Sequence, residues 1–592
     1  MKNNRDSNHI SFLNKYKYSI LLLAIIFLVI ANNFIWIRNS KGAPIGNALQ
    51  DLFPGINFYL DMVQGRISFG GLFKGIFRIF SFTSTFPVDW NNYIRFQFFI
   101  YPPLPPLSYA AFYFIFGPHA KIELMANTIY LAIAMISIYG IGKKISDRKS
   151  GLLAAFILST FPGVIGFSRH IYAEFILMCV SCLMLFFLLK TDNFKNRGYS
   201  LLFGISLGLA ALTKWEFLLI VGGPVLWYLG RLSFSEDNCR RNFLLAALVG
   251  LLMSFVWYSM SINDIIWRLF YGPDSILLQR YSASSFGSFL IQKASFYILA
   301  IINTFIGLFY FLLLLLAGII MAFKANKDKG HSPQTSDYRF YAVFIILWIA
   351  VPYLFLSLAN LQTASHVLLV LPALALIVGL GIFSLKNVIL RSALIFLIVL
   401  YGMGSYLHSF VDFGKLDALY KLKIYLSPDL RLALTTATDN IPRDEWGRNH
   451  FYPPDTRNWK INEIISFVKE DSRLMHPRPV VLVLGNKEEF NSFSFQYYNL
   501  LWGEGLFIEP RSNDRSKMPK DRSKFDYVVI KSDFETIDGP TLSQIVKITC
   551  SINKDLHNPE QFKKDFFDKY KLIREYLLPD NTKGKIYKLV SS

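Results

Sequence analysis

Long apolar segments fill the first two thirds of this 592-residue chain and leave it few folds to adopt. A helix that crosses a lipid bilayer needs about 20 mainly apolar residues, and its backbone polar groups must be satisfied within the helix. Apolar runs predict about eleven membrane-spanning helices, at 19–37, 122–141, 151–168, 172–190, 199–213, 216–230, 242–261, 294–323, 340–357, 367–385 and 391–408. Two of these segments, 199–213 and 216–230, are short, so one kinked element in place of two helices is an alternative.

Charged residues divide the chain into two regions. Residues 1–408 contain 32 Lys and Arg and 15 Asp and Glu, whereas residues 409–592 contain 29 and 26. The second region therefore has the charge density of a soluble domain, although most of the net charge of +20 lies in the first. This division excludes a soluble enzyme, a nucleic-acid-binding protein with one basic face and a disordered chain. We predict a transmembrane domain at 1–408 and a soluble domain at 409–592.

Lys and Arg residues alternate between the two sets of loops. Clusters occur in the N-terminal segment and in loops near 143–149, 190–197, 231–241, 324–339 and 386–391, while the opposite loops carry scattered cations. Cytoplasmic loops are enriched in Lys and Arg. We therefore expect a multi-pass plasma (inner) membrane protein with a cytoplasmic N-terminus. Loop 38–121 and the C-terminal domain would lie on the extracytoplasmic side.

The long first outer loop contains apolar patterns of its own. Residues 48–64 and 72–82 are typical of short helices that lie in the headgroup layer. The prolines within 101–106 force an extended path, and an apolar helix is expected at 107–116. We interpret this end of the loop either as part of a binding pocket or as a rigid turn before a re-entrant helix.

The C-terminal region has the alternation of an α/β domain. Buried strands are predicted at 480–485 and 526–530, helices at 490–502 and 559–576, and a last strand at 585–590. A small sheet covered by helices follows from this order. The turn at Gly485-Asn486 is not a glycine-rich phosphate loop, so no nucleotide site is predicted.

Several ionisable residues lie inside the predicted spans or at their outer ends, where such groups commonly mark function. Arg169, His170 and Glu174 lie at the outer end of the 151–190 hairpin, Lys214 separates two apolar runs, and His366 follows a short outer loop. Arg169, Lys214 and His366 would offer cationic donors to a phosphate at the membrane surface. Cations that reach up to lipid headgroups are the alternative interpretation.

Taken in order, these features resemble the GT-C membrane glycosyltransferases. The nearest resemblance is to the dolichyl-phosphate-mannose protein mannosyltransferase and aminoarabinose transferase group. The motifs are Tyr101-Pro102-Pro103-Leu104, residues 140–144 followed by 151–155, Ser168-Arg169 and residues 204–214. The resemblance implies a GT-C-like transmembrane domain with a C-terminal extracytoplasmic α/β domain. It also implies inverting transfer of a sugar from a polyprenyl-phosphate-linked donor to an acceptor on the extracytoplasmic face.

This chemistry needs a carboxylate base to deprotonate the acceptor and cations to neutralise the leaving phosphate. By the resemblance, the first-loop acid of the family would fall near Asn47, which cannot act as a base. Asp51, one helical turn later, and Glu174 are therefore the catalytic candidates. The expected donor-phosphate-binding residues are Arg169, His170, Lys214 and His366, and the expected pocket residues are Asn47, Tyr101, Pro102 and Pro103.

The expected partners are a lipid-linked sugar donor and membrane lipids, with no nucleic acid. The acceptor, whether glycan, lipid or protein, is not specified by the sequence. No cofactor and no metal site are expected, although a divalent metal stays an open alternative. The residues Asn47 and His366, which depart from the family pattern, leave a second hypothesis of a GT-C-like scaffold or binding subunit without catalysis. A lipid or glycan transporter is a third hypothesis, which the absence of an internal repeat disfavours.

Overall fold

The computed structural model describes residues 3–41, 43, 52–64, 102–230, 237–270, 295–327, 333–358, 364–411, 454–473, 479–485, 490–502, 506–508, 525–531 and 569–590. Two compact units are present. The first contains α1 up to Ile37, the start of α5 and the helices from α6 to α17. The second contains α2, residues 109–123 and the described elements of the C-terminal region. The predicted domain boundary at 408 stays a prediction, because most of the connecting segment lies outside the described residues.

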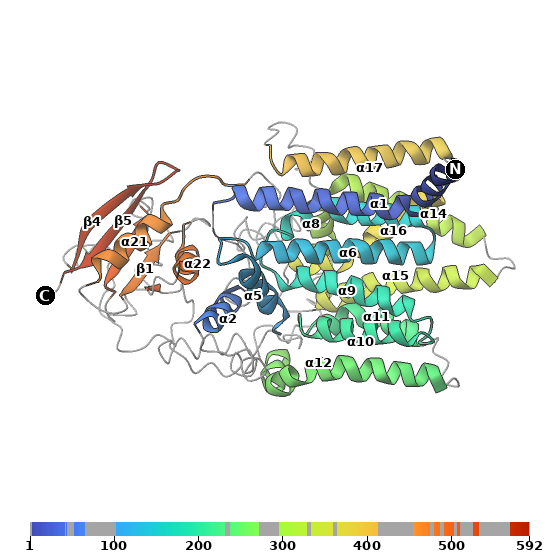
Figure 1. Cartoon of the computed structure of the whole chain (residues 1–592), viewed down its shortest axis with the longest axis horizontal. Helices are drawn as coiled ribbons and strands as arrows, with labels where there is room; N and C mark the ends of the chain where they lie inside the picture. The colour runs from blue at the N-terminus through green and yellow to red at the C-terminus, as the bar shows by residue number, and fades with distance from the viewer. Residues whose placement is uncertain are drawn as a thin grey trace, which may run out of the picture. The chain divides into compact units, whose positions relative to one another are not determined.

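Apolar helices form nearly all of the first unit (Figure 1). Eight of them are long and apolar enough to cross a membrane: Tyr16–Asn39, Leu124–Ile145, Ala173–Lys190, Asp237–Asn263, Ser295–Phe323, Arg339–Ser357, Ser365–Ser384 and Val388–His408. The helices at the other three predicted spans are shorter. The described helices are α1 (Asn3–Asn39), α2 (Phe53–Val63), α5 (Leu104–Phe116), α6 (Leu124–Ile145), α7 (Arg148–Thr160), α8 (Pro162–Phe167), α9 (Ala173–Lys190), α10 (Arg197–Ala211), α11 (Phe217–Leu229), α12 (Asp237–Phe270), α14 (Gly307–Lys327), α15 (Pro333–Leu358), α16 (Leu371–Ser384) and α17 (Val388–His408), with a π-helical turn η3 (Ile301–Ile306) and a 3-10 helix η4 (Ala364–Val370).

Helix boundaries in this unit follow local sequence signals. Asp147 accepts a hydrogen bond from the backbone N–H of Ser150 at 2.7 Å and begins α7, as a short acidic side chain does at a helix N-terminus. The predicted span 151–168 divides at Phe161, because Pro162 lacks a backbone N–H and begins the separate helix α8. Residues 212–216 separate α10 from α11, so the short predicted pair forms two helices.

Small residues allow close helix packing in the first unit. A methyl group added at Gly151 of α7 would lie 2.4 Å from the carbonyl oxygen of Tyr139 in α6. At Gly204 of α10, the added methyl would lie 2.4 Å from the backbone oxygen of Ala246 in α12. Such backbone contact favours dispersion forces between helices that lack a hydrophobic driving force in lipid. These glycines hold the helices that position the polar residues described below.

A Gly151→Ala substitution is expected to destabilise the protein by about 1–3 kcal/mol, because the overpacked methyl group must push backbone atoms apart. Gly318→Ala is the matched control, since nothing lies within 4 Å of a methyl group added in α14. Thermal unfolding of the detergent-purified variants checks the prediction. Equal melting temperatures for the two variants would contradict it.

The C-terminal region forms a five-stranded sheet with the strand order β2-β1-β3-β5-β4. Its elements are α21 (Ile461–Asp471), β1 (Val480–Leu484), α22 (Ser492–Trp502), β2 (Phe507–Ile508), β3 (Tyr527–Lys531), β4 (Tyr570–Leu577) and β5 (Lys583–Leu589). β1 pairs in parallel with β2 and β3, whereas β5 pairs antiparallel with β3 and β4. The predicted α/β character of this region is confirmed.

The strand predictions for this region and one of its helix predictions have different outcomes. Predicted strands 480–485, 526–530 and 585–590 correspond to β1, β3 and β5. The helix predicted at 559–576 is wrong over 570–576, which belongs to β4, and residues 559–568 lie outside the described residues. Residues 570–577 pair with β5 across a short turn, and this pairing satisfies backbone groups that a helix would have bonded internally.

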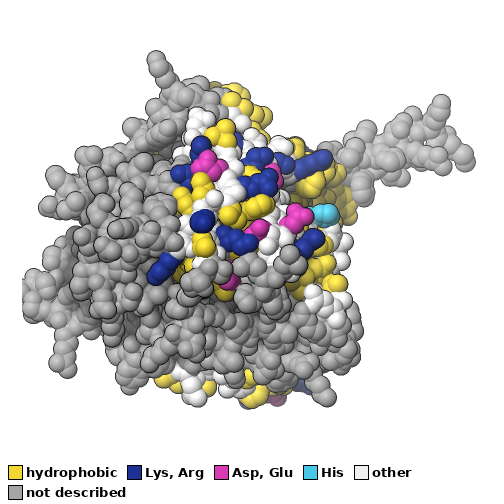
Figure 2. All heavy atoms as spheres, turned by 90° about the vertical axis from the view of Figure 1, so that its left-hand side faces the viewer, with side chains coloured by type: hydrophobic (Ala, Val, Ile, Leu, Met, Phe, Trp, Pro, Cys, Tyr) yellow, Lys and Arg dark blue, Asp and Glu magenta, His cyan; other side chains and the backbone are white. Residues whose placement is uncertain are grey.

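Several ion pairs lie on the surface of the described C-terminal elements. Figure 2 shows Lys and Arg side chains there next to Asp and Glu side chains. Lys588 contacts Asp471 at 2.7 Å, and Lys583 contacts Glu575 at 2.8 Å. Exposed pairs of this kind contribute about 0–1 kcal/mol each. Because such pairs contribute little, the stability of the sheet depends on its buried apolar residues.

A buried carboxyl group joins separate segments of the second unit. Glu123 accepts hydrogen bonds from the hydroxyl groups of Tyr113, at 2.8 Å, and Tyr497, at 3.3 Å. The Tyr497 hydroxyl in turn accepts the backbone N–H of Lys121 at 2.7 Å. Burial raises the pKa of Glu123 from 4.5 to about 7, although the tyrosine hydrogen bonds and Lys121 oppose this shift. Helix α22 is thus bonded to the segment that follows α5 through one ionisable group.

The stability of this junction is expected to depend on pH. Because the folded-state pKa of Glu123 is raised, its effect on stability is most favourable below pH 4.5 and declines until about pH 7. The backbone N–H of Lys121 should therefore be more protected from hydrogen exchange at pH 5 than at pH 8, after correction for intrinsic exchange. Glu123→Gln should remove this difference, whereas Glu470→Gln, at an exposed position of α21, should keep it.

Candidate functional site

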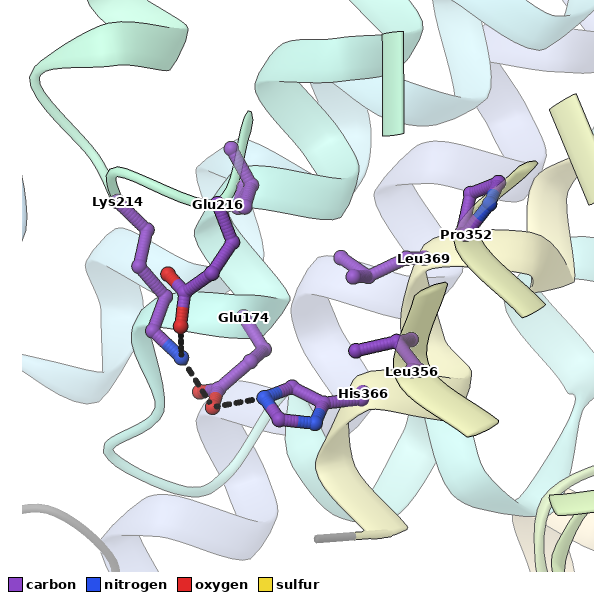
Figure 3. A pocket seen from close by; sticks show the side chains of 8 residues that line it. Glu174, Lys214, Glu216, Pro352, Leu356, His366 and Leu369 are labelled. Carbon is purple, nitrogen blue, oxygen red and sulfur yellow. Dashed lines mark hydrogen bonds and ion pairs between the residues drawn. The ribbon is translucent and has the colours of Figure 1, made fainter. Parts of the chain in front are cut away.

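Four ionisable side chains from three parts of the first unit line one pocket (Figure 3). Glu174 lies in the first turn of α9, Lys214 and Glu216 come from the turn between α10 and α11, and His366 lies on η4. The remaining lining residues are apolar: Leu177, Pro352, Leu356 and Leu369. The pocket leaves about 10 Å³ of space, room for about one water molecule.

Lys214 is the centre of the polar cluster. Its Nζ lies 2.9 Å from Oε1 of Glu174 and 3.1 Å from Oε1 of Glu216. The same Glu174 oxygen lies 3.8 Å from Nε2 of His366 and accepts a hydrogen bond from the Ser365 hydroxyl at 3.3 Å. The ammonium group of Lys214 therefore forms ion pairs with two carboxylates.

The cluster is shielded from solvent. The side chains of Glu174 and Lys214 are 5% and 7% exposed. Buried charges are stable only when they are paired and hydrogen-bonded, so the contacts of Lys214 offset much of the desolvation cost. The second oxygens, Oε2 of Glu174 and of Glu216, are nevertheless buried and have no hydrogen-bond partner among the described residues. Two residues that line the pocket thus each carry a buried acceptor atom that is unsatisfied among the described residues.

Local backbone geometry places Lys214 in this position. Helix α10 ends at Ala211, and the N–H of Phe217 bonds to the carbonyl of Lys214 at 3.2 Å as α11 begins. The N–H of Leu104 donates to the carbonyl of Leu212 at 2.9 Å. The Tyr-Pro-Pro-Leu motif is therefore bonded to the turn that carries Lys214.

Arg169 belongs to a second polar cluster, which surrounds the end of α1. Its Nε donates to Oδ1 of Asn33 at 3.0 Å, and its guanidinium lies 4.9 Å from the ring centre of Trp36. Asn33 also donates to the hydroxyl groups of Thr128 and Ser168, at 3.1 and 3.0 Å. Arg169 is fully buried and does not line the Glu174 pocket.

The remaining sequence-predicted residues have different locations. His170 is buried beside the aromatic rings of Phe167 and Tyr172, which also contact each other, and it does not line the pocket. Pro102 is buried and Pro103 is half-buried. Asn47, Asp51 and Tyr101 lie outside the described residues, so their predicted roles stay predictions. The predicted helix at 48–64 is present as α2 from Phe53, and the one at 72–82 lies outside the described residues.

The structure thus brings together Glu174, Lys214 and His366, and it adds two residues that the predicted site did not include. Glu216 binds Lys214, and Ser365 binds Glu174. Glu216 follows Lys214 by two residues in the sequence, and this proximity is the sequence feature that could have identified Glu216 as a site residue. Among the described residues, no group of three or more His, Cys, Asp and Glu side chains is arranged to hold a metal ion.

The fold is that of the GT-C membrane glycosyltransferases, as the sequence predicts. Residues 101–260 match the family model described as dolichyl-phosphate-mannose-protein mannosyltransferase. No curated protein sequence matches the chain.

Two solved structures illustrate this similarity. ArnT from Cupriavidus metallidurans, bound to undecaprenyl phosphate, is 11% identical with a TM-score of 0.50, and the match covers 98% of this chain and 99% of ArnT. A mutant of the arabinofuranosyltransferase AftD from Mycobacteria is also 11% identical with a TM-score of 0.50, over 97% of this chain and 42% of AftD. At these identities, the likeness establishes the fold alone.

Loss of the Lys214 charge is expected to destabilise the protein strongly, because two buried carboxylates would lose their counterion. We expect Lys214→Gln to cost about 3–5 kcal/mol, and Glu174→Gln in the same chain to restore part of the loss. Lys583→Gln is the matched control: its side chain is 53% exposed, and its solvent-screened pair with Glu575 should change stability little. Thermal unfolding of the four proteins checks this order, which an equal loss in both single variants would overturn.

Proposed function

We propose that the protein transfers a sugar from a polyprenyl-phosphate-linked donor to an acceptor at the extracytoplasmic face of the membrane, with inversion. The observation that supports this most directly is the buried Glu174–Lys214 pocket within a GT-C fold. The ArnT structure with undecaprenyl phosphate supports the class of donor. The acceptor, whether lipid, glycan or protein, is left open.

The reaction requires a base and a means to accept negative charge. The acceptor hydroxyl would attack the anomeric carbon while its proton passes to a carboxylate, and the bond to the phosphate oxygen would break with its electron pair. Glu174 is the proposed base within the described residues, because it lines the pocket and its Oε2 is a buried acceptor without a hydrogen-bond partner there. Asp51 is the other candidate. Arg169, His170, Lys214 and His366 are the predicted cations for the leaving phosphate.

The orientation is part of the same proposal. Alternating clusters of Lys and Arg support a cytoplasmic N-terminus and an extracytoplasmic C-terminal domain in the plasma (inner) membrane. The pocket would then face the outer side, where a lipid-linked sugar is presented. No cofactor is proposed, and addition of EDTA to the assay below tests the alternative of a divalent metal.

Purified protein in nanodiscs should transfer radiolabelled sugar from at least one undecaprenyl-phosphate-linked donor in a panel to acceptors in an envelope membrane extract. Glu174→Gln should lower the transfer rate by about 100-fold or more, since general-base catalysis contributes about 10²–10⁴-fold. Asp51→Asn tests the second candidate in the same assay.

Glu470→Gln, at an exposed position in the C-terminal region, is the matched control and should keep the wild-type rate. No transfer from any donor, beside an active GT-C enzyme under the same conditions, would refute the proposal. Unchanged rates in both carboxylate variants would refute the assigned bases. Normal cellular function without any transfer would instead support the hypothesis of a scaffold or binding subunit.

A further inference from the structure

We infer that the Glu174 pocket binds the hydroxyl groups of the donor sugar and excludes the donor phosphate. This inference rests on the proposed function and changes the roles that the sequence predicted for Lys214 and His366. Lys214 then acts as a positioning residue, because it holds the carboxylates of Glu174 and Glu216 in place. Three properties of the pocket support this assignment: its charge, its free hydrogen-bonding atoms and the arrangement of its walls.

The charge of the cluster disfavours a phosphate. Glu174 and Glu216 contribute two negative charges, and Lys214 contributes one positive charge. The net charge is −1 when His366 is neutral and zero when His366 is protonated, so the cluster is net positive in neither state. A phosphate in contact with these groups would lie within a few ångströms of two carboxylates, and repulsion between like charges is strong at a site with little water.

The free hydrogen-bonding atoms are of one kind. Oε2 of Glu174 and Oε2 of Glu216 are buried and have no hydrogen-bond partner among the described residues. A carboxylate oxygen only accepts hydrogen bonds, and a buried acceptor without a donor is unfavourable. Phosphate oxygens are acceptors too and cannot satisfy these atoms. Sugar hydroxyl groups can donate to them, and hydrogen bonds to a charged acceptor are the stronger kind.

The walls of the pocket match the two surfaces of a sugar ring. Figure 3 shows Glu174, Lys214 and Glu216 on one side and Pro352, Leu356 and Leu369 on the other. A pyranose or furanose ring has hydroxyl groups at its edge and C–H groups on its faces. The space left between these walls is about 10 Å³, room for about one water molecule. A sugar unit therefore enters only when the walls move apart.

Binding measurements on the full-length protein in nanodiscs test this assignment. The probes are undecaprenyl phosphate without a sugar and a panel of undecaprenyl-phosphate-linked hexoses and pentoses. Wild-type protein should bind at least one sugar-bearing lipid about tenfold more tightly than the bare lipid phosphate. Glu174→Gln and Glu216→Gln should each remove most of this tenfold preference and leave the affinity for undecaprenyl phosphate within about twofold. Glu470→Gln should change neither affinity.

Each outcome decides the question. An equal loss of affinity for both kinds of lipid in the carboxylate variants would place the phosphate in this pocket and overturn the inference. A wild-type protein that prefers no sugar-bearing lipid would also overturn it. This comparison uses the wild-type protein alone, so it is valid even if the variants do not fold. The proposed function fails separately, through absence of transfer in the activity assay, and that result would leave a measured sugar preference intact.

Discussion

The contact of one lysine with two buried carboxylates is the interaction on which the site depends. Lys214 draws together α9 and the turn between α10 and α11, and Glu174 extends the contact to η4 through Ser365 and His366. Ionised groups at such depth are stable only when opposite charges face each other. The ionisable side chains of the pocket therefore lie together in an interior that apolar helices surround. That arrangement suits a reaction in which charge moves and water must be limited.

Breaks in the helices make this concentration of polar groups achievable. Pro162 ends one predicted span early, and residues 212–216 separate two short helices. Side chains near such breaks can face a cavity, whereas those in the middle of a regular span face lipid or a neighbouring helix. Backbone contact at Gly151 and Gly204 then fixes the helices on either side. The polar residues of the candidate site thus lie where regular secondary structure stops.

The sequence allowed good prediction of the helices and partial prediction of the site, for physical reasons. Most spans depend on local hydropathy, so they could be predicted, although the break of one span at Phe161 was not. Arg169 and Glu174 are near neighbours in the sequence but belong to different clusters, because Asn33 of α1, 136 positions away, binds Arg169. No local pattern encodes such a pairing. The strand at 570–577 was missed for the same reason, since β5 determines its conformation.

The hydrogen bond from Leu104 to Leu212 joins a rigid proline segment to the backbone beside Lys214. Movement of this segment must break the bond or carry the Lys214 turn along with it, since Pro102 and Pro103 have restricted backbone torsions. If the hydrogen bond holds, a displacement of the proline segment also shifts the turn that carries Lys214, and with it the contacts of Lys214 with Glu174 and Glu216.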